Sequence, residues 1–221
     1  MIFYPDRFAA LCTVALSFVL TGNTSAETIT EYSAGHADIR IAFRGGELEL
    51  LYHFGEGSVL DGVRQSTSFE GQANEAYVRV GDASLDFPGA VSWLGTSASD
   101  PVWILPQGNI TGQPFLGIAT HQMTTTDFSS LTLEMTNLIG PGEFAMWQGL
   151  TPPIYWQTND GIGTNPGDDQ LPFPVRGHDH FNYGFTKEGV YQLELTATAE
   201  FVAGGSVADT EIFTFVVGNA T

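Results

Sequence analysis

The sequence predicts an all-β protein with an immunoglobulin-like fold, a sandwich of two antiparallel sheets. Valine, threonine, phenylalanine and tyrosine cluster in short runs where apolar and polar residues alternate, as in strands with one buried face. Turn-forming residues separate these runs, since the 221 residues include 26 glycines and 11 prolines. No stretch of useful length repeats its apolar residues with the 3.6-residue period of a helix.

About nine runs have the length and pattern of strands. The first two, 37–43 and 47–53, flank Gly45-Gly46 and predict a hairpin. The last two have the clearest alternation, at 190–201 and 211–217, and a glycine-rich turn joins them. The others are 76–80, 102–105, 117–122, 131–137 and 143–148. Short strands at such turn-punctuated spacing are typical of a sandwich.

The longest part without a strand pattern is 151–176, which carries Pro152-Pro153 and Pro166-Gly167. A loop of this length inside a compact domain is usually functional or mobile. No internal repeat and no linker-like segment divides the chain. We therefore expect residues 27–221 to form a single domain.

The first 26 residues predict an export signal. An apolar stretch runs from Phe8 to Leu20 and is too short to span a bilayer comfortably, and the small residues Thr24-Ser25-Ala26 follow it. The alternative is a retained membrane anchor, which the short apolar stretch disfavours. We expect cleavage after Ala26 and an extracytoplasmic protein, secreted, periplasmic or held at the cell surface, with no membrane span once the signal is removed.

Composition limits the classes of function. The only cysteine, Cys12, lies in the signal, so the mature protein has no disulfide and depends on its hydrophobic core. A chain of this size buries roughly 70% of its unfolded surface, which is enough for stability. The net charge is −18, and the signal contributes one residue of each sign, Asp6 and Arg7. This charge argues against nucleic acid and anionic membranes as partners, and suits a soluble exported protein or one that attracts cations.

The most informative motif is His178-Asp179-His180, which places two of the five histidines at i and i+2. In an extended segment these side chains point to the same face. His36 and Asp38 form a second pair with the same spacing. If the fold brings the pairs together, they form a site for zinc or copper, because neutral imidazole suits both metals and a carboxylate can complete the ligand set. The alternative is that these histidines only pack or hydrogen-bond where a strand begins.

Three other groups are weaker candidates. His121 and Met123 are a copper-like combination, although such a pair is more often a surface histidine beside a core methionine. His53 ends a predicted strand, which suggests an exposed or capping role. The loop at 159–169 is rich in oxygen ligands, but its spacing fits no calcium motif, and a turn-rich acidic loop is the preferred interpretation.

Aromatic residues offer a different kind of site. Trp93, Trp103, Trp147, Tyr155 and Trp156 could line a sugar-binding surface, with Tyr155 and Trp156 as the best exposed candidates. In a sandwich, however, tryptophan more often lies in the core. Catalytic signals are thin: the chain has no G-x-S-x-G nucleophile motif, P-loop or dinucleotide fingerprint. We therefore predict a binding protein and not an enzyme.

Several short motifs occur in an order that resembles a known family. They are Gly35-His36-Ala37-Asp38, Val102-Trp103-Ile104-Leu105-Pro106-Gln107, Leu131-Thr132-Leu133, Gly140-Pro141-Gly142-Glu143-Phe144, and His178-Asp179-His180-Phe181-Asn182-Tyr183-Gly184-Phe185 followed by Gly189-Val190-Tyr191. The set is similar to the repeat domain of actinobacterial surface-anchored proteins, found also in the choice-of-anchor M group of exported bacterial proteins.

The resemblance implies a β-sandwich at the cell surface, associated with cell-surface components or with an ABC transporter of the metal-uptake type. It favours the metal hypothesis, because His36, His178 and His180 all fall within its motifs. The chain departs from the family in that no sortase signal or hydrophobic tail follows the last predicted strand, so we expect it to be released or held by a partner.

The leading hypothesis is a non-enzymatic module that captures a divalent transition metal, or a metal-bearing ligand, with His36, Asp38, His178 and His180. One alternative is a structural or adhesive surface domain without metal. Another is a carbohydrate-binding module that uses Tyr155 and Trp156.

Overall fold

The computed structural model describes residues 29–81, 91–150, 153–163 and 168–220. The predicted signal at 1–26 lies outside these residues. Among the residues described, no helix is long and apolar enough to cross a membrane. The only helical elements in this part of the chain are two short 3₁₀ helices, η1 (Ala73–Glu75) and η2 (Ser92–Leu94).

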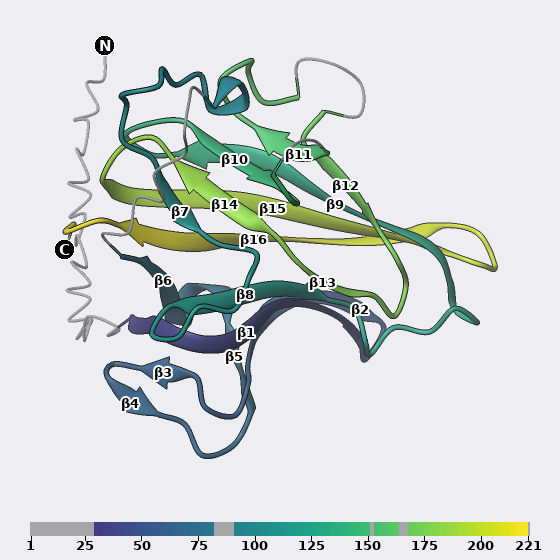
Figure 1. The fold of residues 1–221 in the computed structure, drawn as a ribbon. Coiled ribbons are helices and arrows are strands. Elements are labelled where there is room, and N and C mark those ends of the chain that lie inside the picture. Colours follow the sequence, from purple (N-terminus) through teal and green to yellow (C-terminus); the bar gives the residue numbers. More distant parts are fainter. Residues whose placement is uncertain (1–28, 82–90, 151–152, 164–167, 221) are drawn as a thin grey trace, which may run out of the picture.

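The described residues form two sheets (Figure 1). The larger has twelve strands: β1 (Thr30–Arg44), β2 (Glu47–Phe54), β3 (Val59–Leu60), β4 (Val63–Arg64), β5 (Phe69–Gln72), β6 (Ala76–Val80), β8 (Pro114–Ala119), β9 (Phe128–Ile139), β12 (Gln170–Phe173), β13 (His178–His180), β15 (Gly189–Phe201) and β16 (Ser206–Val217). The smaller has four: β7 (Trp103–Leu105), β10 (Phe144–Trp147), β11 (Ile154–Gln157) and β14 (Asn182–Phe185). The predicted all-β sandwich is confirmed.

The prediction of antiparallel pairing needs a correction. Most neighbours are antiparallel, but β1 pairs in parallel with β6 and with β8, and β16 pairs in parallel with β6. Parallel neighbours need long crossover connections, which hairpin signals in the sequence do not reveal. In Figure 1, β8, β1 and β2 form one layer and β9, β15 and β16 form another.

Strand β1 joins these two layers. Its first residues, 30–32, pair with β6, whereas residues from Gly35 onward pair with β8 and then with β2. The change of partner occurs at Gly35, which has a φ of +84°. An added Cβ there would lie 2.7 Å from the carbonyl oxygen of Gly57, so glycine meets both the conformational and the steric requirement. The residue directly after this bend is His36.

All nine predicted runs overlap strands, with two corrections. The run expected at 117–122 is shifted to β8, which ends at Ala119. The segment 151–176, expected to be irregular, contains β11 and β12. Both are four-residue strands at the edges of their sheets, and β12 includes Pro172, which an edge strand tolerates. Such short strands have too few residues to show alternation.

The core is apolar and rich in aromatic residues. Its largest fully buried side chains include those of Trp156, Tyr52, Tyr183 and Phe213. Burying one such side chain contributes about 1.5–3 kcal/mol, so many together stabilise a domain that has no disulfide among its described residues. On β1 the core side chains are Ala37, Ile39 and Ile41. The two-residue period of a strand therefore turns the intervening residues, 36, 38 and 40, to the outer face.

Candidate metal centre

Strand β8 brings the two predicted pairs together. It lies between β1 and β13, pairing in parallel with the first and antiparallel with the second. In this register, Gly117 of β8 is opposite Asp38 on one side and His180 on the other. Residues aligned across neighbouring strands share a face. His36, Asp38, His178 and His180 thus converge on one outer face of the sheet.

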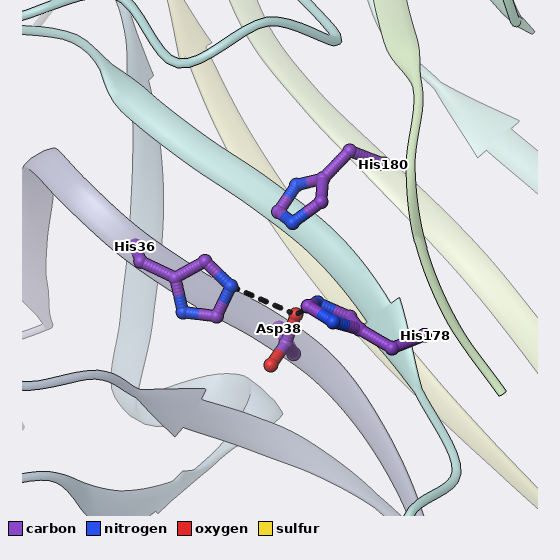
Figure 2. A group of neighbouring side chains, drawn as sticks. All are labelled: His36, Asp38, His178 and His180. Carbon is purple, nitrogen blue, oxygen red and sulfur yellow. Dashed lines mark hydrogen bonds and ion pairs between the residues drawn. The ribbon is translucent and has the colours of Figure 1, made fainter. Parts of the chain in front are cut away.

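The four side chains point toward one another (Figure 2). Asp38 Oδ1 lies 2.9 Å from His178 Nε2 and 3.5 Å from His36 Nε2. One potential ligand atom from each of the four residues lies within 4.8 Å of all the others. Ligand atoms on tetrahedral zinc are about 3.3 Å apart, given bonds of about 2.0–2.1 Å. The two Asp38 contacts already bracket that separation, and small side-chain rotations would bring the whole set to it.

Two residues of β8 shape the space between these donors. A Cβ added to Gly117 would lie 2.5 Å from Asp38 Oδ1 and 2.9 Å from His180 Cε1, so the absence of a side chain keeps this space open. Phe115 stacks on the imidazole of His180, with ring centroids 3.6 Å apart and planes inclined by 2°. The strand thus fixes one ligand ring and leaves a gap beside it.

The carboxylate of Asp38 is the charged group of the cluster. Asp38 is only 2% exposed, and its Oδ1 faces the imidazoles of His178 and His36. A buried carboxylate is costly unless it is paired with a positive charge or coordinates a metal. Neutral imidazoles compensate only part of this cost, so a bound cation would complete the pairing.

Burial keeps two of the imidazoles neutral. It lowers the pKa of His180 to about 4, and the neighbouring His178 and His36 lower it further than burial alone would. Burial also lowers the pKa of His36, partly opposed by the charge of Asp38. Neutral imidazole is the form that binds metal ions, so protons compete little for these two ligands at pH 7. The buried Nδ1 of His180 has no hydrogen-bond partner, leaving that nitrogen uncommitted.

The remaining two histidines border the same cluster. His53 pairs with Asp38 across the β1–β2 hairpin, and its side chain is half-buried instead of exposed or capping as predicted. The signal was available, because a turn at Gly45-Gly46 fixes the register that places residue 53 opposite residue 38. His121 is exposed, with its ring centroid 5.2 Å from that of His178. All five histidines of the chain therefore gather along one face.

The other predicted sites do not form as sites. Met123 is buried in the core while His121 is exposed, which is the alternative foreseen for that pair. In the described part of the 159–169 loop, Asp169 accepts hydrogen bonds from the backbone amides of Gln157 at 2.8 Å and Gly163 at 2.9 Å. Its carboxylate thus organises the loop; residues 164–167 of the calcium candidate lie outside the described structure.

The proposed sugar platform is wrong. Trp156 is 0% exposed and belongs to the main hydrophobic core. Tyr155 packs edge-on against Phe181 and donates a hydrogen bond to Gln148 Oε1 at 2.9 Å. In a sandwich the aromatic residues of a short edge strand are needed to fill the core, which outweighs the exposure that an irregular loop would have given.

Substituting Gly117 tests whether the gap matters. Gly117→Ala is expected to weaken zinc binding at least about tenfold, because the methyl group displaces Asp38 and His180 and even outer-shell changes cost about 10–100-fold. Overpacking should also lower the free energy of unfolding by about 1–3 kcal/mol. A zinc titration and a urea melt measure the two effects. Gly108→Ala is the matched control, since a Cβ there meets nothing within 4 Å; equal behaviour of the two variants would contradict the role assigned to the gap.

The chain matches no protein-family model, no curated protein and no solved structure. Function must therefore be inferred from the His–Asp cluster itself, whose four side chains could hold a metal ion.

Proposed function

We propose that this protein is a non-enzymatic binding module that captures one divalent transition metal ion, zinc in the first place, with His36, Asp38, His178 and His180. The single observation that carries the proposal is the convergence of three imidazoles and a buried carboxylate beside the gap at Gly117. Two distant sequence segments supply these groups, and each has the spacing that presents both of its side chains to one face.

The donor atoms favour zinc. Nitrogen and carboxylate oxygen are ordinary zinc ligands, and four protein donors are the number that a closed tetrahedral site needs. Zinc sites that catalyse reactions usually have three protein ligands and a bound water, so the four-donor set supports binding over catalysis. Copper(II) accepts the same donors and generally binds more tightly than zinc, which makes it the second candidate.

The cellular setting is part of the same proposal. The apolar stretch from Phe8 to Leu20 supports export, and the net charge of −18 favours cations near the surface. The resemblance of the motifs to surface-anchored domains supports a metal-uptake ABC transporter or another cell-surface component as the partner. A metal-capturing domain outside the cytoplasm would supply such a transporter with its cargo.

Calorimetric titration tests the proposal. Residues 27–221, purified without a histidine tag and stripped with a chelator, should bind about one equivalent of zinc, the content of one closed site. Bound zinc should also raise the melting temperature, because a ligand that binds only the folded state stabilises it. No heat of binding and no shift in melting would contradict the proposal and favour the structural alternative, in which the histidines serve packing alone.

A further inference from the structure

His121 lies at the solvent side of the metal cluster. Its side chain is exposed, and its ring centroid is 5.2 Å from that of His178. The side chain of His178 is itself 32% exposed, whereas that of Asp38, which His178 contacts, is 3% exposed. Exposure therefore falls in steps from His121 through His178 to Asp38, and an imidazole or carboxylate stands at each step.

The turn that carries His121 is anchored on its inner side. The backbone amide of Thr120 donates to the carbonyl oxygen of Gly177 at 2.9 Å, and its hydroxyl donates to that of Pro174 at 2.7 Å. Gly177 directly precedes His178. Met123 closes the turn, because its amide donates to the Thr120 carbonyl oxygen at 2.9 Å and its side chain is buried. These contacts fix the backbone of residue 121 relative to that of residue 178.

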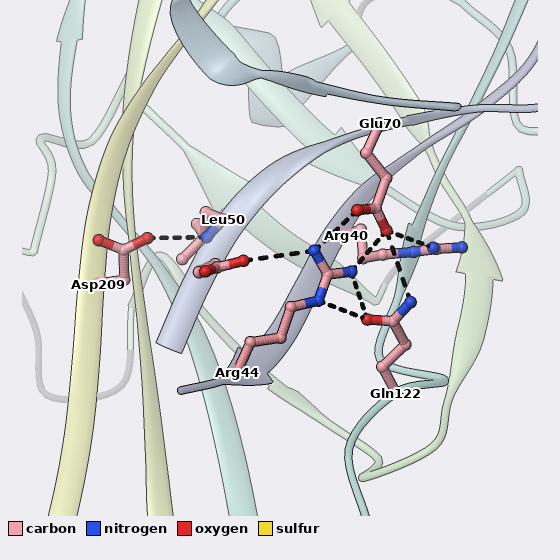
Figure 3. Close-up of polar contacts among 7 residues, drawn as sticks. Arg40, Arg44, Leu50, Glu70, Gln122 and Asp209 are labelled. Atoms are coloured by element: carbon pink, nitrogen blue, oxygen red, sulfur yellow. Dashed lines mark hydrogen bonds and ion pairs between the residues drawn. The ribbon is translucent and has the colours of Figure 1, made fainter. Parts of the chain in front are cut away.

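Gln122 anchors the turn on its outer side (Figure 3). Its Oε1 accepts a hydrogen bond from Arg44 Nε at 3.0 Å. Arg44 also pairs with Glu70, whose Oε1 lies 2.6 Å from Arg44 Nη2 and 2.9 Å from Arg40 Nη1. The turn is thereby tied to β1 and β5, the strand neighbourhood of the metal cluster. An exposed imidazole held between two anchored residues is preorganised to face His178.

We propose that His121 is a solvent-side ligand through which metal ions reach and leave the cluster, so that the protein hands its zinc to a partner instead of retaining it. This inference rests on the proposed function. Zinc is first held by His121 and the exposed His178, and it then passes to Asp38, His36 and His180 as His121 is released. Each step exchanges one neutral imidazole for another ligand and leaves the charge of the ion unchanged.

This role has a kinetic signature. A residue that contacts the ion only in transit lowers the barrier for association and dissociation equally, so it does not change the dissociation constant. His121→Ala is expected to slow both rates about tenfold, within the one to three decades by which rates vary among variants of one site. The dissociation constant should stay within about twofold of that of the unsubstituted protein.

Stopped-flow measurements with a chromogenic zinc chelator test this inference. The off-rate comes from transfer of zinc to the chelator, and the on-rate from uptake of zinc by the metal-free protein, both at one salt concentration. His121→Asp restores a zinc-binding group and should recover most of the rate, whereas His121→Asn should not. His53→Gln removes an imidazole from the opposite side of the cluster, where the side chain is half-buried, and should leave both rates unchanged.

Each remaining outcome overturns a distinct claim. Unchanged rates in His121→Ala would show that metal does not pass this residue. A weaker dissociation constant with a faster off-rate would make His121 a ligand of the final complex and not a transfer ligand. If the unsubstituted protein binds no zinc at equilibrium, the proposed function itself fails, and that result is obtained before any rate is compared.

Discussion

Replacing His178 or His180 by alanine should lower zinc affinity by at least about a hundredfold, since changing an outer-shell partner alone costs about 10–100-fold. Each substitution removes one of the four donors that converge within 4.8 Å. Both residues lie on the short strand β13, outside the hydrophobic core, so the variants should still fold. Calorimetric titration measures the loss of affinity, and circular dichroism checks the fold.

Asp179 provides the matched control, because it lies between the two histidines and its side chain alternates to the other face of β13. Asp179→Asn keeps the oxygen that accepts a hydrogen bond from the His180 amide and should bind zinc normally. Thermal melts of all three variants, with and without zinc, distinguish the structural alternative. If the histidine variants are strongly destabilised and zinc has no effect on any melt, the histidines are packing residues.

Trp156→Ala should lower the free energy of unfolding by about 3–5 kcal/mol, the usual cost of removing a large aromatic side chain from a core. Trp156 is fully buried on β11, and Met146 of β10 is its strand partner. The cavity left behind cannot be filled without moving both strands. Urea denaturation measures the effect, and zinc affinity at low temperature should be unchanged as long as the variant remains folded.

Leu150→Ala is the control for this substitution, since Leu150 is 84% exposed and should change stability by less than about 0.5 kcal/mol. A Trp156→Ala variant as stable as the unsubstituted protein would contradict the burial of this residue. It would also reopen the possibility of a sugar-stacking surface, which the buried position of the indole excludes.

Local pattern made much of the fold predictable. Alternation gave the strands around Ile39, Leu133 and Leu195, and the paired glycines at 45 and 46 marked the β1–β2 hairpin. The same alternation placed His178 and His180 on one face. These features depend on residues close together in the chain, where the two-residue period of a strand is a direct physical constraint.

The distance between the two ligand pairs was beyond prediction because it depends on long-range topology. His36 and His180 are joined through β8, which pairs in parallel with β1, and no turn signal marks a parallel pairing. Gly117 offered a partial clue, because a glycine within a strand often marks a close approach of other groups. Its partners could be named only once the register of the three strands was known.

The central claim is most directly tested by anomalous diffraction at the zinc absorption edge, using crystals of zinc-loaded protein. We expect one peak among His36, Asp38, His178 and His180, with metal–ligand distances of about 2.0–2.2 Å. Such a peak would establish the four-donor site. A zinc peak elsewhere on the protein, or these four side chains ordered without zinc at saturating metal concentration, would contradict the proposed metal centre.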